Sequence, residues 1–258
     1  MFKILRLLLC LNLLLLQACQ QKATLNADTM IHSPKQHNAA VYNTQLGLAY
    51  LKQGDRVRAK RKLIRALDLA PKSADTNAAM AYYCEKTGEL SDARNYYKRA
   101  LSLAPNSGAQ LNNYGSFLCR QGSYKEAESY FLKAVKDARY LNTAGAYENA
   151  GLCTALIPEY TKAEYFFAKA LEQDPQRAQS LYELVRIELK QNHANKALAY
   201  IKQYQKLAWH ESSLLALAVE ASHQSGDLKA EKVYKMRLNN LNSTDHTGAN
   251  NEYNNFNG

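Results

Sequence analysis

The 258-residue sequence contains few residues that break or bend helices, with only 11 Gly and 5 Pro. It also lacks long segments of alternating β-branched and polar residues, which are typical of half-buried strands. Ala, Leu, Lys and Gln, which favour helices, are abundant, and so is Tyr. The composition therefore predicts an all-α protein.

The short motifs of common catalytic sites are missing as well. GxxxxGK[ST], GxGxxG, HExxH and GxSxG are all absent, and the six His residues are dispersed without the spacing of a metal site. We therefore expect no enzyme, no cofactor, no metal and no small-molecule substrate. The alternative is an enzyme with an unrecognised site, which a thermal-shift screen against small metabolites would begin to test.

Acidic residues are in the minority: 23 Asp and Glu stand against 33 Lys and Arg, and the formal net charge is +10. The densest basic stretch is RAKRKLIR at residues 58–65. It is either a solvated helix face or a nucleic-acid-binding surface. The first interpretation is favoured because the remaining basic residues are scattered, so no nucleic-acid partner is expected.

Long hydrophobic runs are absent too. The longest, Leu7–Leu16, contains Asn12 and is shorter than the roughly 20 residues of a membrane-spanning helix. Lys3 and Arg6 precede this run, and the small residue Ala18 follows it. These features are typical of a secretory signal peptide.

Cys19 directly follows the predicted signal peptide, residues 1–18. The stretch LQAC, which ends at Cys19, resembles a bacterial lipobox, although Gln17 replaces the more usual Ala, Ser or Thr. In a lipobox the cysteine is acylated and becomes the first residue of the mature chain. Several acyl chains would bind a bilayer almost permanently, because burial contributes about 0.8 kcal/mol per CH₂. Ordinary secretion and an uncleaved anchor are the alternatives. Gln20 rather than Asp follows the cysteine, so the resemblance implies the periplasmic face of the outer membrane.

A period of 34 residues runs through the rest of the chain. The recurring residues are Gly47, Gly54, Ala59, Ala66 and Pro71, then Ala81, Gly88, Ala93, Ala100 and Pro105, then Gly115, Gly122, Ala127 and Ala134, and after two extra residues Gly151, Ala163, Ala170 and Pro175. Small residues at positions 8 and 20 of each block let two helices approach closely. Gly at position 15 suits a helix end with positive φ, and Pro at position 32 ends the second helix. The pattern predicts a series of helix pairs.

This period and these small-residue positions resemble the tetratricopeptide repeat. The resemblance implies a right-handed superhelical solenoid of about six repeats: residues 40–73, 74–107, 108–141, 144–177, 178–211 and 212–241. The last two depart from the pattern, with Asn192 in place of Gly and Trp209 in place of Pro in the fifth. Terminal repeats that cap a solenoid commonly deviate. We expect residues 19–39 to form a flexible spacer and the Asn-rich residues 242–258 a disordered tail.

Three cysteines lie in the predicted repeats, each on the first helix of its repeat: Cys84, Cys119 and Cys153. Successive first helices are neighbours in a solenoid, so Cys119 and Cys153 can come within the roughly 7 Å between Cα atoms that a disulfide requires. The alternative is three buried free thiols. A bridge would connect the third repeat to the fourth across the two-residue insertion.

The resemblance also implies a partner-binding groove, lined by positions 2, 5, 6, 9, 12 and 13 of each first helix. On this chain the candidates are Tyr82, Asn112, Asn113, Arg120, Glu148, Asn149, Leu152, Tyr182 and Arg186. Asn113 and Asn149 share position 6, and an Asn amide can donate to and accept from one peptide unit at once. The alternative is that both are ordinary polar surface residues. Tyr82, Leu152 and Tyr182 are expected to be apolar anchors.

Two stretches resemble a narrower family. LNNYGSFLCRQGSYKEAESYFLKA at residues 111–134 and ENAGLC at residues 148–153, with the lipidated amino terminus, resemble the type IV pilus biogenesis and stability lipoproteins. These are six-repeat pilotins of Gram-negative bacteria. The resemblance implies that the chain binds the pilus secretin subunit, delivers it to the outer membrane and promotes its multimer assembly. The alternative is a periplasmic lipoprotein adaptor for another envelope complex, such as murein-processing enzymes.

Overall fold

The computed structural model describes residues 34–157 and 159–254, and side chains between residues 36 and 243. The predicted signal peptide and Cys19 lie outside the described residues. The described part is helical and contains no strand. Its helices are α2 (Pro34–Lys52), α3 (Arg56–Leu69), α4 (Ala74–Thr87), α5 (Leu90–Leu103), α6 (Gly108–Arg120), α7 (Tyr124–Ala134), α8 (Thr143–Thr154), α9 (Tyr160–Gln173), α10 (Ala178–Lys190), α11 (Ala194–Gln203), α12 (Gln205–Ala208), α13 (Ser212–Gln224) and α14 (Leu228–Asn254).

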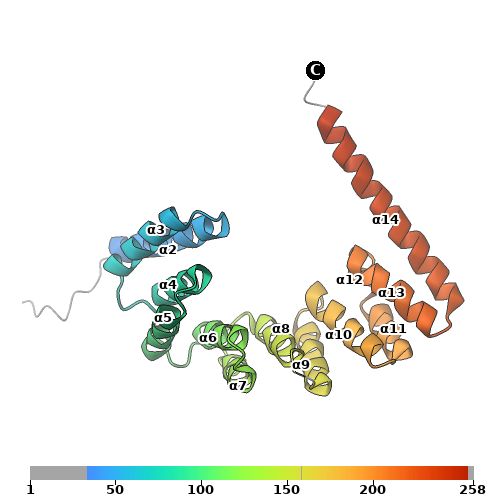
Figure 1. The fold of residues 1–258 in the computed structure, drawn as a ribbon, viewed down its shortest axis with the longest axis horizontal. Helices are drawn as coiled ribbons and strands as arrows, with labels where there is room; N and C mark the ends of the chain where they lie inside the picture. The colour runs from blue at the N-terminus through green and yellow to red at the C-terminus, as the bar shows by residue number, and fades with distance from the viewer. Residues whose placement is uncertain (1–33, 158, 255–258) are drawn as a thin grey trace, which may run out of the picture.

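Consecutive helices pack in pairs, and the pairs follow one another in a curved row (Figure 1). The pairs are α2/α3, α4/α5, α6/α7, α8/α9, α10/α11 and α13/α14, with the short α12 before the last pair. The first helix of each pair also packs against the first helix of the next pair. The prediction of an all-α solenoid is therefore confirmed.

The recurring small residues lie where the two helices of a pair are closest. The alanines at position 20 have no exposed surface: Ala59, Ala93, Ala127, Ala163 and Ala197. At position 8, a Cβ on Gly151 would come 2.7 Å from a ring carbon of Phe167, and Gly47 and Gly115 are comparably crowded. Real Cβ atoms do not approach this closely, so a side chain there would force the helices apart.

Position 15 ends the first helix with a left-handed residue. Gly54, Gly88 and Gly122 have φ values of 81°, 88° and 78°, and Asn192 has a φ of 61°. Asn adopts this conformation more readily than most residues that carry a Cβ. Asn192 therefore replaces Gly in the fifth pair, which the sequence pattern marked as degraded.

The amino-terminal boundary of the solenoid differs from the prediction. Helix α2 begins at Pro34, six residues before the predicted first repeat. Proline suits the first turn of a helix because its φ is already helical and its missing N–H would have no partner there. The predicted spacer is therefore wrong for residues 34–39, and residues 19–33 lie outside the described part.

The carboxyl-terminal boundary also differs. Helix α14 continues to Asn254, through most of the predicted disordered tail. Its first half is held by Tyr234, Leu238 and Leu241, which pack against the core. Extending a helix that is already formed avoids a second nucleation cost. Residues 242–254, for which the sequence predicts disorder, thus continue α14, and residues 255–258 lie outside the described part.

The apolar core is divided mainly between two clusters along the row. One runs from the first to the fourth pair around Phe117 and Phe131, and the other runs from the fourth to the sixth pair around Leu184 and Ile201. Each pair thus buries its apolar face against its neighbours, as stacked repeats require. None of the described helices is long and apolar enough to cross a membrane.

Candidate functional site

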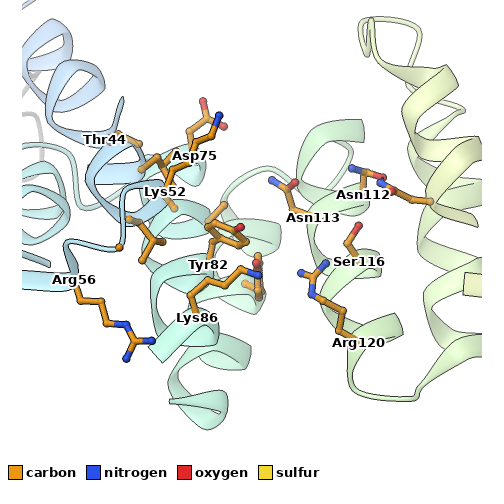
Figure 2. A pocket seen from close by; sticks show the side chains of 17 residues that line it. Thr44, Lys52, Arg56, Asp75, Tyr82, Lys86, Asn112, Asn113, Ser116 and Arg120 are labelled. Atoms are coloured by element: carbon orange, nitrogen blue, oxygen red, sulfur yellow. The ribbon is translucent and has the colours of Figure 1, made fainter. Parts of the chain in front are cut away.

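A large hollow lies on the first three helix pairs and has a volume of about 1090 Å³. The first helices α2, α4 and α6 supply most of its lining, with Tyr97 from α5 and Asn149 from α8. We call this hollow the groove. The lining residues labelled in Figure 2 are Thr44, Lys52, Arg56, Asp75, Tyr82, Lys86, Asn112, Asn113, Ser116 and Arg120.

Five of the nine predicted binding residues line the groove: Tyr82, Asn112, Asn113, Arg120 and Asn149. Figure 2 shows Tyr82 on α4 and Asn113 on α6 at the same hollow. Tyr82 is 37% exposed, and the Lys86 Nζ lies 5.3 Å from the centroid of its ring. An accessible aromatic ring beside a cation is a suitable anchor for a partner side chain.

The three asparagines of the groove differ in what they can offer a partner. The Asn149 Nδ2 donates a hydrogen bond to the Asn112 Oδ1 at 3.0 Å, which connects α8 to α6. Asn113 is exposed, and no side-chain hydrogen bond of Asn113 occurs among the described residues. Only Asn113 therefore has its whole amide available for a peptide backbone.

Arg120 is held at the groove by an internal ion pair. Its Nη2 lies 2.9 Å from the Oε2 of Glu85 on α4, and the Tyr97 hydroxyl donates to the same oxygen at 3.2 Å. Burial lowers the pKa of Arg120, but the hydrogen bond and charge of Glu85 outweigh it and raise the pKa overall. Burial, together with the Glu85 charge, raises the pKa of Tyr97, so its hydroxyl stays protonated. This cluster fixes α4 against α6.

The remaining charges leave the groove positive. Lys52 and Arg56 are exposed, and neither they nor Lys86, whose Nζ lies over the Tyr82 ring, form an ion pair among the described residues. Asp75 is the acidic residue of the lining, and its Oδ1 accepts a hydrogen bond from the Gln110 Nε2 at 2.6 Å. The groove therefore favours a partner segment that carries acidic groups.

The groove also contains residues of the first repeat, which were not predicted from the sequence. The repeat positions used for the other repeats would have identified most of them. Positions 5, 9, 12 and 13 of the first repeat are Thr44, Leu48, Leu51 and Lys52, and all four line the groove. Arg56 follows on α3 and has no counterpart in that register.

Four predicted residues do not line the groove. The Glu148 Oε1 pairs with the Arg177 Nη1 at 2.9 Å within the fourth repeat, and its Oε2 accepts a hydrogen bond from the Ser180 hydroxyl of the fifth repeat at 2.7 Å. Leu152 and Tyr182 pack against the core, and Arg186 forms an ion pair with a glutamate on its own helix. The repeat register identifies the inward face of a helix, but it cannot tell whether the neighbouring helix covers that face.

A disulfide connects Cys119 on α6 to Cys153 on α8, with their Cα atoms 5.8 Å apart. It joins the third repeat to the fourth beside the groove.

Cys84 is free and buried, and burial raises the pKa of its thiol to about 11. A thiol with this pKa is almost entirely protonated at neutral pH and reacts slowly. No metal-binding group of three or more His, Cys, Asp or Glu side chains occurs among the described residues.

The fold consists of stacked helix pairs with buried small residues at a 34-residue period and a groove on the first helices. These features define a class of repeat protein that serves as a binding scaffold. The sequence pattern of the tetratricopeptide repeat matches residues 44–108, 79–142 and 118–178, which together cover more than half of the chain. The chain therefore belongs to the tetratricopeptide-repeat family.

Particular members of this class resemble the chain along most of its length. It is 29% identical over 197 residues to the type IV pilus assembly protein PilF of Pseudomonas aeruginosa, covering 76% of this chain and 78% of that protein. The solved structure of P. aeruginosa PilF has a TM-score of 0.67 at 28% identity, covering 80% of this chain and 93% of the other. The solved structure of PilW, a widely conserved type IV pilus biogenesis factor, has a TM-score of 0.64 at 28% identity. The match covers 77% of this chain and 91% of the PilW chain.

Proposed function

We propose that this chain is a tetratricopeptide-repeat protein of type IV pilus biogenesis, which acts by holding a partner protein. One observation carries this proposal: the similarity to PilF and PilW extends over more than nine-tenths of both solved chains. It covers 80% and 77% of this chain, which is far more than a single repeat.

Within that role, we propose that the partner is the pilus secretin subunit and that the groove binds a segment of it. The groove offers an accessible ring at Tyr82. Within the described part of the chain, the Asn113 amide has no side-chain hydrogen bond and Lys52 and Arg56 form no ion pair. An extended segment could place an apolar side chain against the ring, a peptide unit on the amide and a carboxylate near the cations. The Arg120–Glu85 ion pair and the disulfide hold α4 and α6, the helices that present Tyr82 and Asn113.

The proposed location is the periplasmic face of the outer membrane, with acylated Cys19 as the lipid anchor. Cys19 lies outside the described residues, so this part rests on the sequence. An anchored groove would raise the effective concentration of a captured segment at the membrane. In this mechanism, capture at the membrane promotes localisation of the secretin, its multimer assembly and the stability of the pilus.

A deletion strain tests this proposal. We expect loss of twitching motility and of heat-stable secretin multimers, and recovery of both when the wild-type chain is supplied. A double variant, Tyr82→Ala with Asn113→Ala, is expected to accumulate normally but fail to restore them. Tyr165→Ala is the matched control, because Tyr165 is 53% exposed on α9 and does not line the groove.

Normal motility and normal multimers in the deletion strain would contradict the proposal. A pull-down then discriminates between partners. Recovery of the secretin supports the pilus role, whereas recovery of murein hydrolases would indicate an adaptor for that different envelope complex.

A further inference from the structure

The basic stretch of the sequence lies on α3, where apolar side chains are exposed among the charges. The helix carries six Lys or Arg side chains and a single Asp. Val57 is 80% exposed and Ile64 is 45% exposed. A solvated helix face would account for the cations alone, but it does not require two branched apolar side chains between them.

These side chains share one side of the helix. Lys60 and Arg61 each lie three or four residues from both Val57 and Ile64, so the four side chains are neighbours on the outward face. With Tyr83 of α4 they border a shallow hollow of about 400 Å³. We call the residues around this hollow the α3 surface: Arg56, Val57, Lys60, Arg61, Ile64 and Tyr83.

The cations of the α3 surface are available to a partner. On α3, Arg58 pairs with Asp55 at the start of the helix. Arg56, Lys60 and Arg61 form no ion pair among the described residues. The α3 surface shares only Arg56 with the groove, so it can be covered while the groove stays accessible.

We infer that the α3 surface docks the first repeat on an anionic lipid bilayer. Lys60 and Arg61 would approach lipid phosphates, where each cation adds to the attraction, and Val57 and Ile64 would enter the boundary between headgroups and acyl chains. A nucleic acid is the less suitable occupant. Its phosphates bind cations, but contacts to its backbone give no role to exposed branched apolar side chains.

The position of α3 in the molecule agrees with this inference. The first pair lies at the amino-terminal end of the curved row (Figure 1). Helix α2 begins fifteen residues after Cys19, so a fully extended connection would keep it within roughly 50 Å of an anchor there. This last argument rests on the proposed anchoring, whereas the charge and exposure of α3 do not.

Vesicle flotation tests the inference with the full chain carrying Cys19→Ser, which removes the thiol that would be acylated. The vesicles contain phosphatidylethanolamine with phosphatidylglycerol, or neutral phosphatidylcholine alone. We expect stronger binding to the anionic vesicles at low salt. Lys60→Glu with Arg61→Glu should lower the partition coefficient for anionic vesicles at least tenfold. Val57→Ser with Ile64→Ser should lower this partition coefficient severalfold. At high salt, where the attraction between charges is screened, this variant should bind less than the parent chain.

The matched control is Lys98→Glu with Lys125→Glu, two exposed bases on α5 and α7, which should bind like the parent chain. Circular dichroism verifies that every variant is folded. Equal binding to both vesicle types, or binding that is insensitive to Lys60 and Arg61, would overturn the inference. So would capture of a labelled DNA duplex that depends on these two residues while vesicle binding does not. Because no acyl anchor and no secretin are present, failure here leaves the pilus proposal unaffected.

Discussion

At the scale of single residues, Asp137 illustrates how one carboxylate closes a repeat. Its Oδ2 accepts a hydrogen bond at 2.9 Å from the backbone N–H of Gly108, the first residue of α6, and its Oδ1 accepts one at 3.0 Å from the N–H of Arg139. These hydrogen bonds, chiefly the one from Gly108, hold the pKa of Asp137 below its ordinary value of 3.8. The start of a helix also favours a negative charge.

The lowered pKa predicts a dependence of stability on pH. Because the folded-state pKa lies below the unfolded value, the stabilisation is present above about pH 4 and is lost as the pH falls through the folded-state pKa. We expect Asp137→Asn to lower the free energy of unfolding at pH 7, and the difference from wild type to shrink toward pH 3. Urea unfolding followed by circular dichroism at several pH values measures this. Asp68→Asn, at an exposed position of α3, is the control, and a difference that stays constant with pH would contradict the role of the charge.

At the scale of helices, the sequence predicts most of the architecture because local packing repeats. The close approach of two helices at Gly151 and Phe167 requires a small residue there whatever the rest of the chain does, so the requirement recurs every 34 residues. The ends of the row have no such requirement. Helix α2 starts at Pro34 and helix α14 extends to Asn254, and both of these ends lie outside the predicted repeats. The 34-residue pattern therefore cannot predict where these two helices begin and end.

The disulfide also belongs to this scale, because it connects α6 to α8 across the two-residue insertion. It closes a segment with a sequence separation of 34 residues, which should stabilise the folded chain by about 3–4 kcal/mol, chiefly by restricting the unfolded state. We expect Cys119→Ala with Cys153→Ala to lose about that much in urea unfolding under non-reducing conditions. A reductant should lower the free energy of unfolding of the wild type by a similar amount, and it should leave that of the variant unchanged. Equal stability of variant and wild type would show that the bridge does not contribute.

At the scale of the whole molecule, the candidate groove is only partly readable from the sequence. Tyr82, Asn113 and Arg120, which the register assigns to the inward face, line the groove because the neighbouring helices leave them accessible. The register fails for Glu148, whose carboxylate accepts a hydrogen bond from the Ser180 hydroxyl of the next repeat at 2.7 Å. Such contacts depend on how far one repeat is rotated from its neighbour, and this rotation is not encoded by the position of a residue within its own repeat.

Site-specific photo-crosslinking in living cells tests the central claim most directly, namely that the groove of the first three repeats holds a pilus secretin segment. Benzoyl-phenylalanine replaces Tyr82 in the groove or, as a control, the exposed Tyr165 on α9. The aromatic replacement keeps a ring at each position. The account predicts a cross-link to the secretin subunit from position 82 and none from position 165. Secretin cross-links from both positions alike, or from neither, would contradict it.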